Sequence, residues 1–184
     1  MSKTTIYCHT LNFQNRKWIL MASERGMCRL AFEHDKVESA NMWLHRYAPQ
    51  HELIEDYGVF AEFGVIDLLE TYFAGKPVSF EKLPLDVWGT PFQQQVWMGL
   101  ARIPYGEVWT YKQLAEAINK PLAMRAVGTA NGQNPLPLIL PCHRVIGSNG
   151  TLTGYRGGLV LKQELLELEG IKHVAATGHE RFVF

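Results

Sequence analysis

Residues 90–132 read TPFQQQVWMGLARIPYGEVWTYKQLAEAINKPLAMRAVGTANG, and their helix signals decide the fold of the second half of the chain. Thr90 and Gln93 have the spacing of a capping box, with a proline between them at the first helical position. Thr110 and Gln113 repeat that spacing. We expect three short helices, over residues 91–102, 111–119 and 123–132. This arrangement is typical of a helix-turn-helix, although other small helical bundles share it.

The third expected helix contains two glycines, Gly128 and Gly132, and each costs roughly 1 kcal/mol relative to alanine in a helix interior. Arg125 and Thr129 share their helical face, and Ala126 follows the arginine. Such a bare face has two interpretations. It packs closely against another helix, or it presses Arg125 into a DNA minor groove, which is about 6 Å wide against about 12 Å for the major groove.

The next segment, NPLPLILPCHRV (134–145), carries the candidate chemistry. Its three prolines predict a rigid, extended, buried piece that ends at Cys142. His143 follows directly, and a neighbouring base can convert a thiol of pKa about 8.5 to the nucleophilic thiolate. Glu169, at the end of a helix expected over 160–169, is a candidate to orient the imidazole. The alternative is that Cys142 is only a small buried hydrophobe.

The same half of the chain has an excess of positive charge. Residues 100–162 hold seven lysines and arginines against two acidic residues, whereas the whole chain has a net charge of zero. The seven are Arg102, Lys112, Lys120, Arg125, Arg144, Arg156 and Lys162. This excess suits a polyanion, and ordinary variation in surface charge explains it equally well.

The composition fits a globular protein of 184 residues, 47% hydrophobic and 20% charged. No apolar run approaches the roughly 18 residues of a membrane span. The first ten residues, MSKTTIYCHT, lack the apolar core of a secretory signal. Cys8, Cys28 and Cys142 cannot all pair, and we interpret the first two as structural. We therefore expect a cytoplasmic protein.

The first half of the chain is expected to be mixed α/β. Residues 16–21 and 27–32 predict a strand hairpin with a turn at 24–26. Residues 40–47 and 60–73 predict helices, the second of which ends at Gly75-Lys76-Pro77. Residues 76–89 lack helical periodicity and are the expected linker.

Five blocks of the sequence together resemble the O6-alkylguanine-DNA alkyltransferases, also called methylated-DNA–protein-cysteine methyltransferases. They are GTPFQQQVW (89–97), IPYGEVWTYKQLA (103–115), RAVGTANGQNP (125–135), PCHRVIG (141–147) and GYRGGL (154–159), the last followed by Leu-Glu-Gly at 168–170. The resemblance implies two domains. The first, over 1–85, is α/β, with a small antiparallel sheet and helices, and is ribonuclease H-like. The second, over 89–173, is mainly α with a winged-helix-like helix-turn-helix, and a tail covers 174–184.

The implied function is DNA repair by direct reversal, in a methylated-DNA–protein-cysteine S-methyltransferase that acts once. The alkyl group of O6-alkylguanine, and of O4-alkylthymine, passes irreversibly to the protein's own cysteine after the nucleotide is flipped out through the minor groove. The implied catalytic residues are Cys142 as acceptor, His143 as base through a water, Glu169 as its orienting carboxylate, Asn134 as a brace, and Tyr111 beside the 3′ phosphate and the leaving guanine. The implied DNA-binding residues are the finger Arg125 with Ala126, Gly128, Thr129 and Gly132. The implied base pocket comprises Pro137, Val145, Tyr155, Arg156 and Gly157.

The resemblance implies no cofactor, double-stranded DNA containing O6-alkylguanine as partner, no membrane and no obligate protein partner. Arg156 departs from the small residue that many relatives carry before the paired glycines, so the pocket rim differs. Some relatives bind zinc in the first domain. Here Cys8, His9, Cys28 and His34 lack that spacing, so we expect no metal.

Two other classes of protein fit part of the sequence. A helix-turn-helix regulator without catalysis accounts for the helices and the positive charge, but not for the Cys-His-Glu set. A cysteine hydrolase accounts for the nucleophile, needs an oxyanion site and turns over. Sequence-specific binding would indicate the first alternative, and turnover the second.

Overall fold

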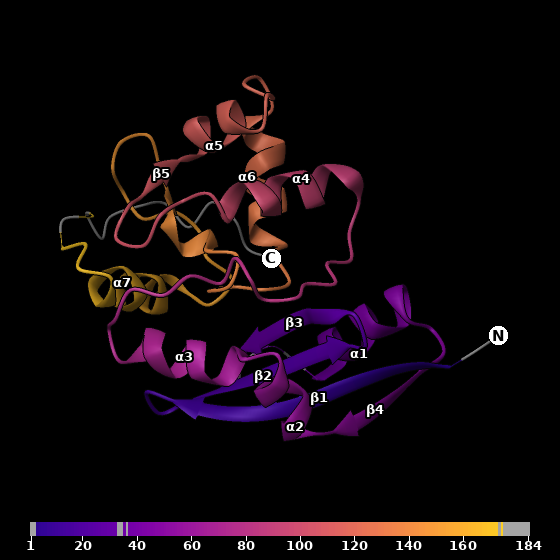
Figure 1. Cartoon of the computed structure of the whole chain (residues 1–184). Coiled ribbons are helices and arrows are strands. Elements are labelled where there is room, and N and C mark those ends of the chain that lie inside the picture. Colours follow the sequence, from indigo (N-terminus) through magenta and orange to yellow (C-terminus); the bar gives the residue numbers. More distant parts are fainter. Residues whose placement is uncertain (1–2, 33–34, 36, 173, 175–184) are drawn as a thin grey trace. The chain divides into compact units, whose positions relative to one another are not determined.

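The computed structural model describes residues 3–32, 35, 37–172 and 174. The chain forms two compact units, Met1–Trp88 and Gly89–Phe184 (Figure 1). In the described residues of the first unit, a four-stranded sheet has the order β3-β2-β1-β4. Its strands are β1 (Thr4–Phe13), β2 (Arg16–Ser23), β3 (Gly26–Phe32) and β4 (His51–Glu55). The expected hairpin is confirmed as β2 and β3, which pair antiparallel.

The sheet differs from the all-antiparallel expectation, because β4 joins β1 in parallel. Sequence analysis missed both of these strands. The β1–β2 turn has positive φ at Gln14 and Asn15, as in the two-residue turns that match strand twist. Gly26, which opens β3, has φ +148°, and a Cβ there would lie 2.5 Å from the Pro84 carbonyl group. Only glycine fits that close approach.

Helices cover both faces of this sheet. The helix expected over 40–47 is α1 (Val37–Tyr47). Its Leu44 joins a cluster on one face with Ile6, Met21 and Cys28. On the other face, Phe73 stacks on Phe13, with ring centroids 4.7 Å apart. The single helix expected over 60–73 is instead two, α2 (Tyr57–Glu62) and α3 (Val65–Phe73), because Gly64 adopts a left-handed conformation between them.

The expected linker, residues 76–89, is non-helical, and its second half packs on the first unit. Met27 N donates to Pro84 O at 2.8 Å, and Asp86 N donates to Met27 O at 2.9 Å. Trp88 stacks on Trp43, with ring centroids 5.1 Å apart. This segment therefore extends the edge of the sheet beside β3.

The second unit contains the expected helices, which are α4 (Pro91–Leu100), α5 (Tyr111–Ala117), α6 (Met124–Gly132) and α7 (Leu159–Leu168). Of these, α4, α5 and α7 end one or two residues earlier than predicted, and α6 ends where predicted. Both capping boxes are confirmed, with Gln93 N donating to Thr90 Oγ1 and Gln113 N to Thr110 Oγ1, each at 3.2 Å. The Trp97 indole of α4 donates to Ala130 O of α6 at 2.7 Å.

The prolines before Cys142 predicted an extended segment, and this prediction is wrong. Leu140 N donates to Leu136 O at 2.8 Å, and Leu138 has φ +71°, so residues 135–140 form a compact buried turn. A short 3₁₀ turn, η1 (Cys142–Arg144), follows and leads into β6 (Val145–Ile146). This strand pairs in parallel with β5 (Trp109–Thr110), a contact between distant residues that local patterns do not reveal. None of the helices in the described ranges is both long and apolar enough to cross a lipid bilayer.

Candidate active site

Cys142 opens the 3₁₀ turn, and its residue surface is 5% exposed. Asn134 holds the preceding turn closed from within. Its Nδ2 donates to Leu140 O at 2.6 Å, and its Oδ1 accepts from Leu136 N at 3.0 Å. Because Asn134 is itself buried, these bonds fix the backbone that delivers the sulfur atom.

His143 and Glu169, 26 positions apart, meet in the interior. The His143 Nε2 to Glu169 Oε1 distance is 2.7 Å, and both side chains are fully buried. Glu169 sits at the C-terminal end of α7, where the sequence placed it, and Gly170 follows with φ +85°. Since Nε2 faces the carboxylate, Nδ1 is the ring nitrogen that can accept a proton.

Arg144 completes a network around the Glu169 carboxylate. Its Nε donates to Oε2 at 2.8 Å, its Nη2 to Oε1 at 3.1 Å, and its Nη1 to the Ile103 carbonyl at 2.7 Å. Gly106 N also donates to Oε2, at 3.2 Å. Every lone-pair direction of the carboxylate is used, which orients the imidazole of His143 firmly.

Burial alone raises the pKa of Glu169, but the hydrogen bonds and charges of His143 and Arg144 outweigh it and lower that pKa to about 2. Burial lowers the pKa of His143, and the hydrogen bond and charge of Glu169 oppose this shift only in part. In the folded protein at neutral pH, the carboxylate is therefore charged and the imidazole is neutral.

This pattern predicts acid destabilisation. A lowered carboxyl pKa stabilises the fold above the unfolded value of 4.5, and this contribution is lost as the pH falls toward about 2. It amounts to on the order of 3 kcal/mol. His143, held neutral, adds to the loss below pH 6.5. Denaturant unfolding at several pH values should show the wild type losing stability between pH 4.5 and 2 relative to Glu169→Gln, and parallel curves would contradict this assignment.

Burial raises the pKa of the Cys142 thiol, and a hydrogen bond from Asn134 and the charges of Arg156 and Lys162 lower it by less. The resting cysteine is thus a neutral thiol. Because Cys142 and His143 are both buried, both neutral forms are favoured at rest, and the role of His143 as the base that takes the thiol proton stays a prediction. A thiolate forms only when its proton is taken up elsewhere.

Tyr111 lies close enough to Cys142 for the cysteine to raise its pKa, after the larger effect of burial. Its pKa is raised mainly by burial. The Thr153 hydroxyl donates to Tyr111 Oη at 3.2 Å. A phenol with a raised pKa keeps its proton at neutral pH and can donate it.

The residues of the implied base pocket are all wholly or partly buried. Pro137 lies in the compact turn before Cys142, and Val145 follows η1. Tyr155 is 8% exposed. Arg156 and Gly157 are half-buried, and the charge of Arg156 acts on Cys142.

Helix α6 has two distinct sides. Arg125, Ala126 and Thr129 are exposed, whereas Gly128 is buried and Gly132 is half-buried. The close-packing interpretation therefore holds at Gly128, which is buried inside the unit. The exposed side presents Arg125 beside alanine and threonine, and its entry into a minor groove stays a prediction.

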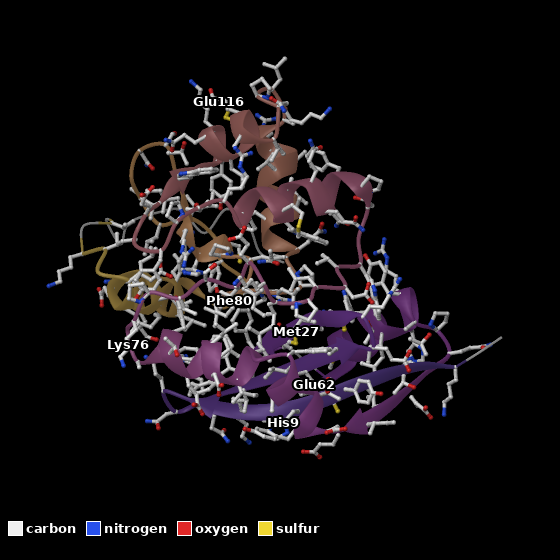
Figure 2. All side chains as sticks on the ribbon, in the orientation of Figure 1. His9, Met27, Glu62, Lys76, Phe80 and Glu116 are labelled. Atoms are coloured by element: carbon white, nitrogen blue, oxygen red, sulfur yellow. The ribbon has the colours of Figure 1, made fainter. Side chains whose placement is uncertain are left out.

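The structure reduces the positively charged surface predicted from the sequence. Arg144 and Lys162 are buried, so they cannot contact a polyanion. Arg102, Lys112, Lys120 and Arg125 are exposed. Glu116 lies 3.8 Å from Lys112 and points outward from α5, so it offsets part of that charge (Figure 2).

Sequence reasoning missed Lys162, a fully buried lysine on α7 that it counted as a surface charge. The available signal was its position directly after Leu161 and three residues before Leu165, on the apolar side of the helix. It also missed the part of Arg144 in the Glu169 network.

Across the described residues, no group of three or more histidine, cysteine or acidic side chains is arranged to hold a metal ion. In the first unit, Cys28 is buried and Cys8 half-buried. His9 faces Glu55 at 3.8 Å. His34 lies outside the described residues.

Two family profiles match the chain in order. The "6-O-methylguanine DNA methyltransferase, ribonuclease-like domain" matches residues 6–87, and the "6-O-methylguanine DNA methyltransferase, DNA binding domain" matches residues 91–171. The inducible methylated-DNA–protein-cysteine methyltransferase of Bacillus subtilis is 39% identical over 91% of this chain and 92% of its own length. The corresponding protein of Methanosarcina barkeri is 58% identical over 82% of this chain and 89% of its own.

A solved structure has the same architecture over most of the chain. It is the crystal structure of Mycobacterium tuberculosis OGT in complex with DNA, with a TM-score of 0.75 and 38% identity, covering 89% of this chain and 93% of its own.

Proposed function

Since this chain belongs to the 6-O-methylguanine DNA methyltransferase family, we propose that it repairs DNA by moving the alkyl group from O6 of guanine to its own Cys142. One observation carries the proposal. Cys142 lies on a turn that Asn134 holds closed, and the two residues after it, His143 and Arg144, both bind the buried Glu169 carboxylate. O4-alkylthymine presents the same kind of electrophilic carbon and is the expected second substrate.

The transfer is an in-line displacement at the alkyl carbon. A sulfur lone pair of Cys142 forms the new S–C bond, and the C–O6 bond breaks with its electron pair going to the guanine. The thiol proton passes through a water to Nδ1 of His143, whose imidazolium Glu169 stabilises. Tyr111, protonated at neutral pH, supplies the proton that the leaving guanine takes up.

No cofactor is needed, because the substrate itself carries the electrophilic carbon. The product is a thioether, whose C–S bond no group in the site is placed to break. Each molecule therefore acts once, and the reaction is stoichiometric.

The test is incubation of the full-length protein with duplex DNA containing a single O6-methylguanine, followed by mass spectrometry of intact protein and peptides. We expect one added methylene mass per protein, on the peptide that contains Cys142, and restored guanine in the DNA. Methylated bases consumed in excess of protein would indicate a hydrolase instead. Binding without any adduct would indicate a DNA-binding regulator.

DNA is held, in this proposal, by the exposed side of α6 and the cations around it. Arg125 enters the space that the extruded nucleotide leaves, and Ala126 and Thr129 beside it are small enough to let the helix approach the groove. The extruded base then reaches Cys142, between Tyr155, Pro137 and the Val145 backbone.

Arg125→Ala should slow repair of duplex DNA by roughly one to two orders of magnitude, because unstacking a base costs a few kcal/mol that the finger offsets. The free base O6-benzylguanine needs no extrusion and should alkylate Cys142 at nearly the wild-type rate. Single-turnover rates on both substrates decide this. Equal slowing on both would show that Arg125 supports the fold or the thiol, not extrusion.

Binding should depend on salt and little on sequence. Lys120 is exposed in the turn before α6, so Lys120→Ala should weaken binding to unrelated duplexes alike and reduce the slope of log affinity against log salt by about one. Fluorescence anisotropy titrations over a salt series measure this slope. An unchanged slope would show that Lys120 does not contact DNA. A strong preference for one DNA sequence motif would support the alternative of a DNA-binding regulator.

A further inference from the structure

Lys162, in the first half of α7, has no exposed surface. Its ammonium group donates to the carbonyl of Val145 at 2.6 Å and to that of Thr153 at 2.9 Å. Burying an ammonium group is costly, and replacing a buried charge by a hydrophobic side chain is often neutral or stabilising. A lysine at this position therefore needs a reason beyond packing.

The two carbonyl groups belong to two segments that both follow Cys142 in the chain. Val145 directly follows the 3₁₀ turn that carries Cys142, and pairs with Trp109 of β5. Thr153 lies in the returning loop, and its hydroxyl donates to Tyr111. Lys162 thus ties the acceptor segment to the loop that positions Tyr111.

The charge of Lys162 also acts on the reacting groups. It lowers the pKa of Cys142, after the larger effects of burial and of Asn134 and Arg156, and the cysteine in turn raises the pKa of the lysine. It also lowers the pKa of His143, together with Arg144. Even with burial, the pKa of Lys162 is about 8, so the group is charged at neutral pH. Arg156 is half-exposed and partly screened by solvent, whereas Lys162 is not.

We propose that Lys162 is a positioning residue for the acceptor: its ammonium group ties the backbone just after Cys142, at Val145, to the returning loop at Thr153, and supplies the buried positive charge that stabilises the thiolate as transfer begins. The inference rests on the proposed function of Cys142. It assigns to α7 a second task besides presenting Glu169.

The test is the pH dependence of Cys142 alkylation by iodoacetamide in the full-length protein, followed on the peptide that contains Cys142. Lys162→Met removes the charge and keeps most of the side-chain volume. We expect the midpoint of its pH profile to rise by about one pH unit, and its rate at pH 7 to fall about tenfold. Lys162→Arg should stay near the wild-type midpoint. Lys82→Met, which changes an exposed lysine of the first unit, is the matched control and should coincide with the wild type.

A Lys162→Met protein with a lower melting temperature but the wild-type midpoint of the alkylation pH profile would show that Lys162 has only a structural role. That result would overturn the proposal. If that variant does not fold, Lys162→Gln, which keeps a donor without the charge, takes its place. A raised midpoint in the glutamine variant and not in the arginine variant supports the proposal, and equal midpoints overturn it. Iodoacetamide requires no DNA, so a shifted midpoint in a protein that fails to demethylate DNA would refute the proposed function alone.

Discussion

Cys142→Ala is expected to abolish alkyl transfer completely, while affinity for duplex DNA stays close to that of the wild type. The sulfur atom is the only group in the site able to form a stable thioether, and no neighbouring side chain can replace it. DNA binding is expected to persist because Arg125, Lys120 and the other exposed cations are unchanged. The measurement pairs adduct mass after incubation with methylated DNA and anisotropy on the same oligonucleotide.

Cys8→Ser is the control for this experiment, since Cys8 is half-buried in the first unit. The histidine that follows it, His9, lies 3.8 Å from the largely exposed Glu55 and is not held in a buried network like that of His143. The Cys8→Ser variant should transfer the methyl group at the wild-type rate. Transfer that survives in Cys142→Ala, or disappears in Cys8→Ser, would show that the acceptor has been assigned to the wrong residue.

Glu169→Ala is expected to destabilise the protein by about 3–5 kcal/mol, because it leaves the buried guanidinium of Arg144 and the imidazole of His143 without their carboxylate. Transfer should also slow by about 10²-fold or more at temperatures where the variant remains folded, since His143 loses the group that orients it. Denaturant unfolding and single-turnover assays on O6-methylguanine DNA measure the two effects separately.

Glu167→Ala is the matched control, because Glu167 is exposed on the same helix and only accepts a bond from Gln163. Its stability should lie within about 0.5 kcal/mol of the wild type. Glu169→Gln keeps the shape of the side chain without its charge. Its stability and its transfer rate should lie between those of Glu169→Ala and Glu167→Ala. If Glu169→Ala is as stable and as active as Glu167→Ala, the network does not support the chemistry.

The helix starts were predictable because they depend on neighbouring residues. Thr90 with Gln93 and Thr110 with Gln113 each satisfy backbone groups three residues away, and no distant part of the chain is needed. The Cys-His pair was equally visible, and the position of Glu169 followed from the 3.6-residue period of α7. Blocks of sequence then indicated the family, which the comparisons with known proteins show.

The edges of the sheet and the path to the acceptor were not visible in this way. β4 is amphipathic only weakly, with three of its five residues exposed, and its pairing with β1 joins residues 47 positions apart. The segment 135–140 contains prolines that favour extended backbone, yet its hydrogen bonds to Asn134 and a positive φ at Leu138 close it into a turn. Tertiary contacts there outweigh the local preference.

The sequence by itself determined the residues to which we assign the chemistry: a proposed acceptor cysteine, its histidine, a carboxylate at a helix end and an arginine leading a helix of small residues. Only the tertiary structure decided the state of those groups. Arg144 and Lys162 read as surface cations, but folding removes both from water and surrounds them with the Glu169 carboxylate and with the carbonyls of Ile103, Val145 and Thr153. Charge is a property of the residue, whereas desolvation and partners come from segments distant in the chain, and these shift the pKa values of Cys142, His143, Lys162 and Glu169.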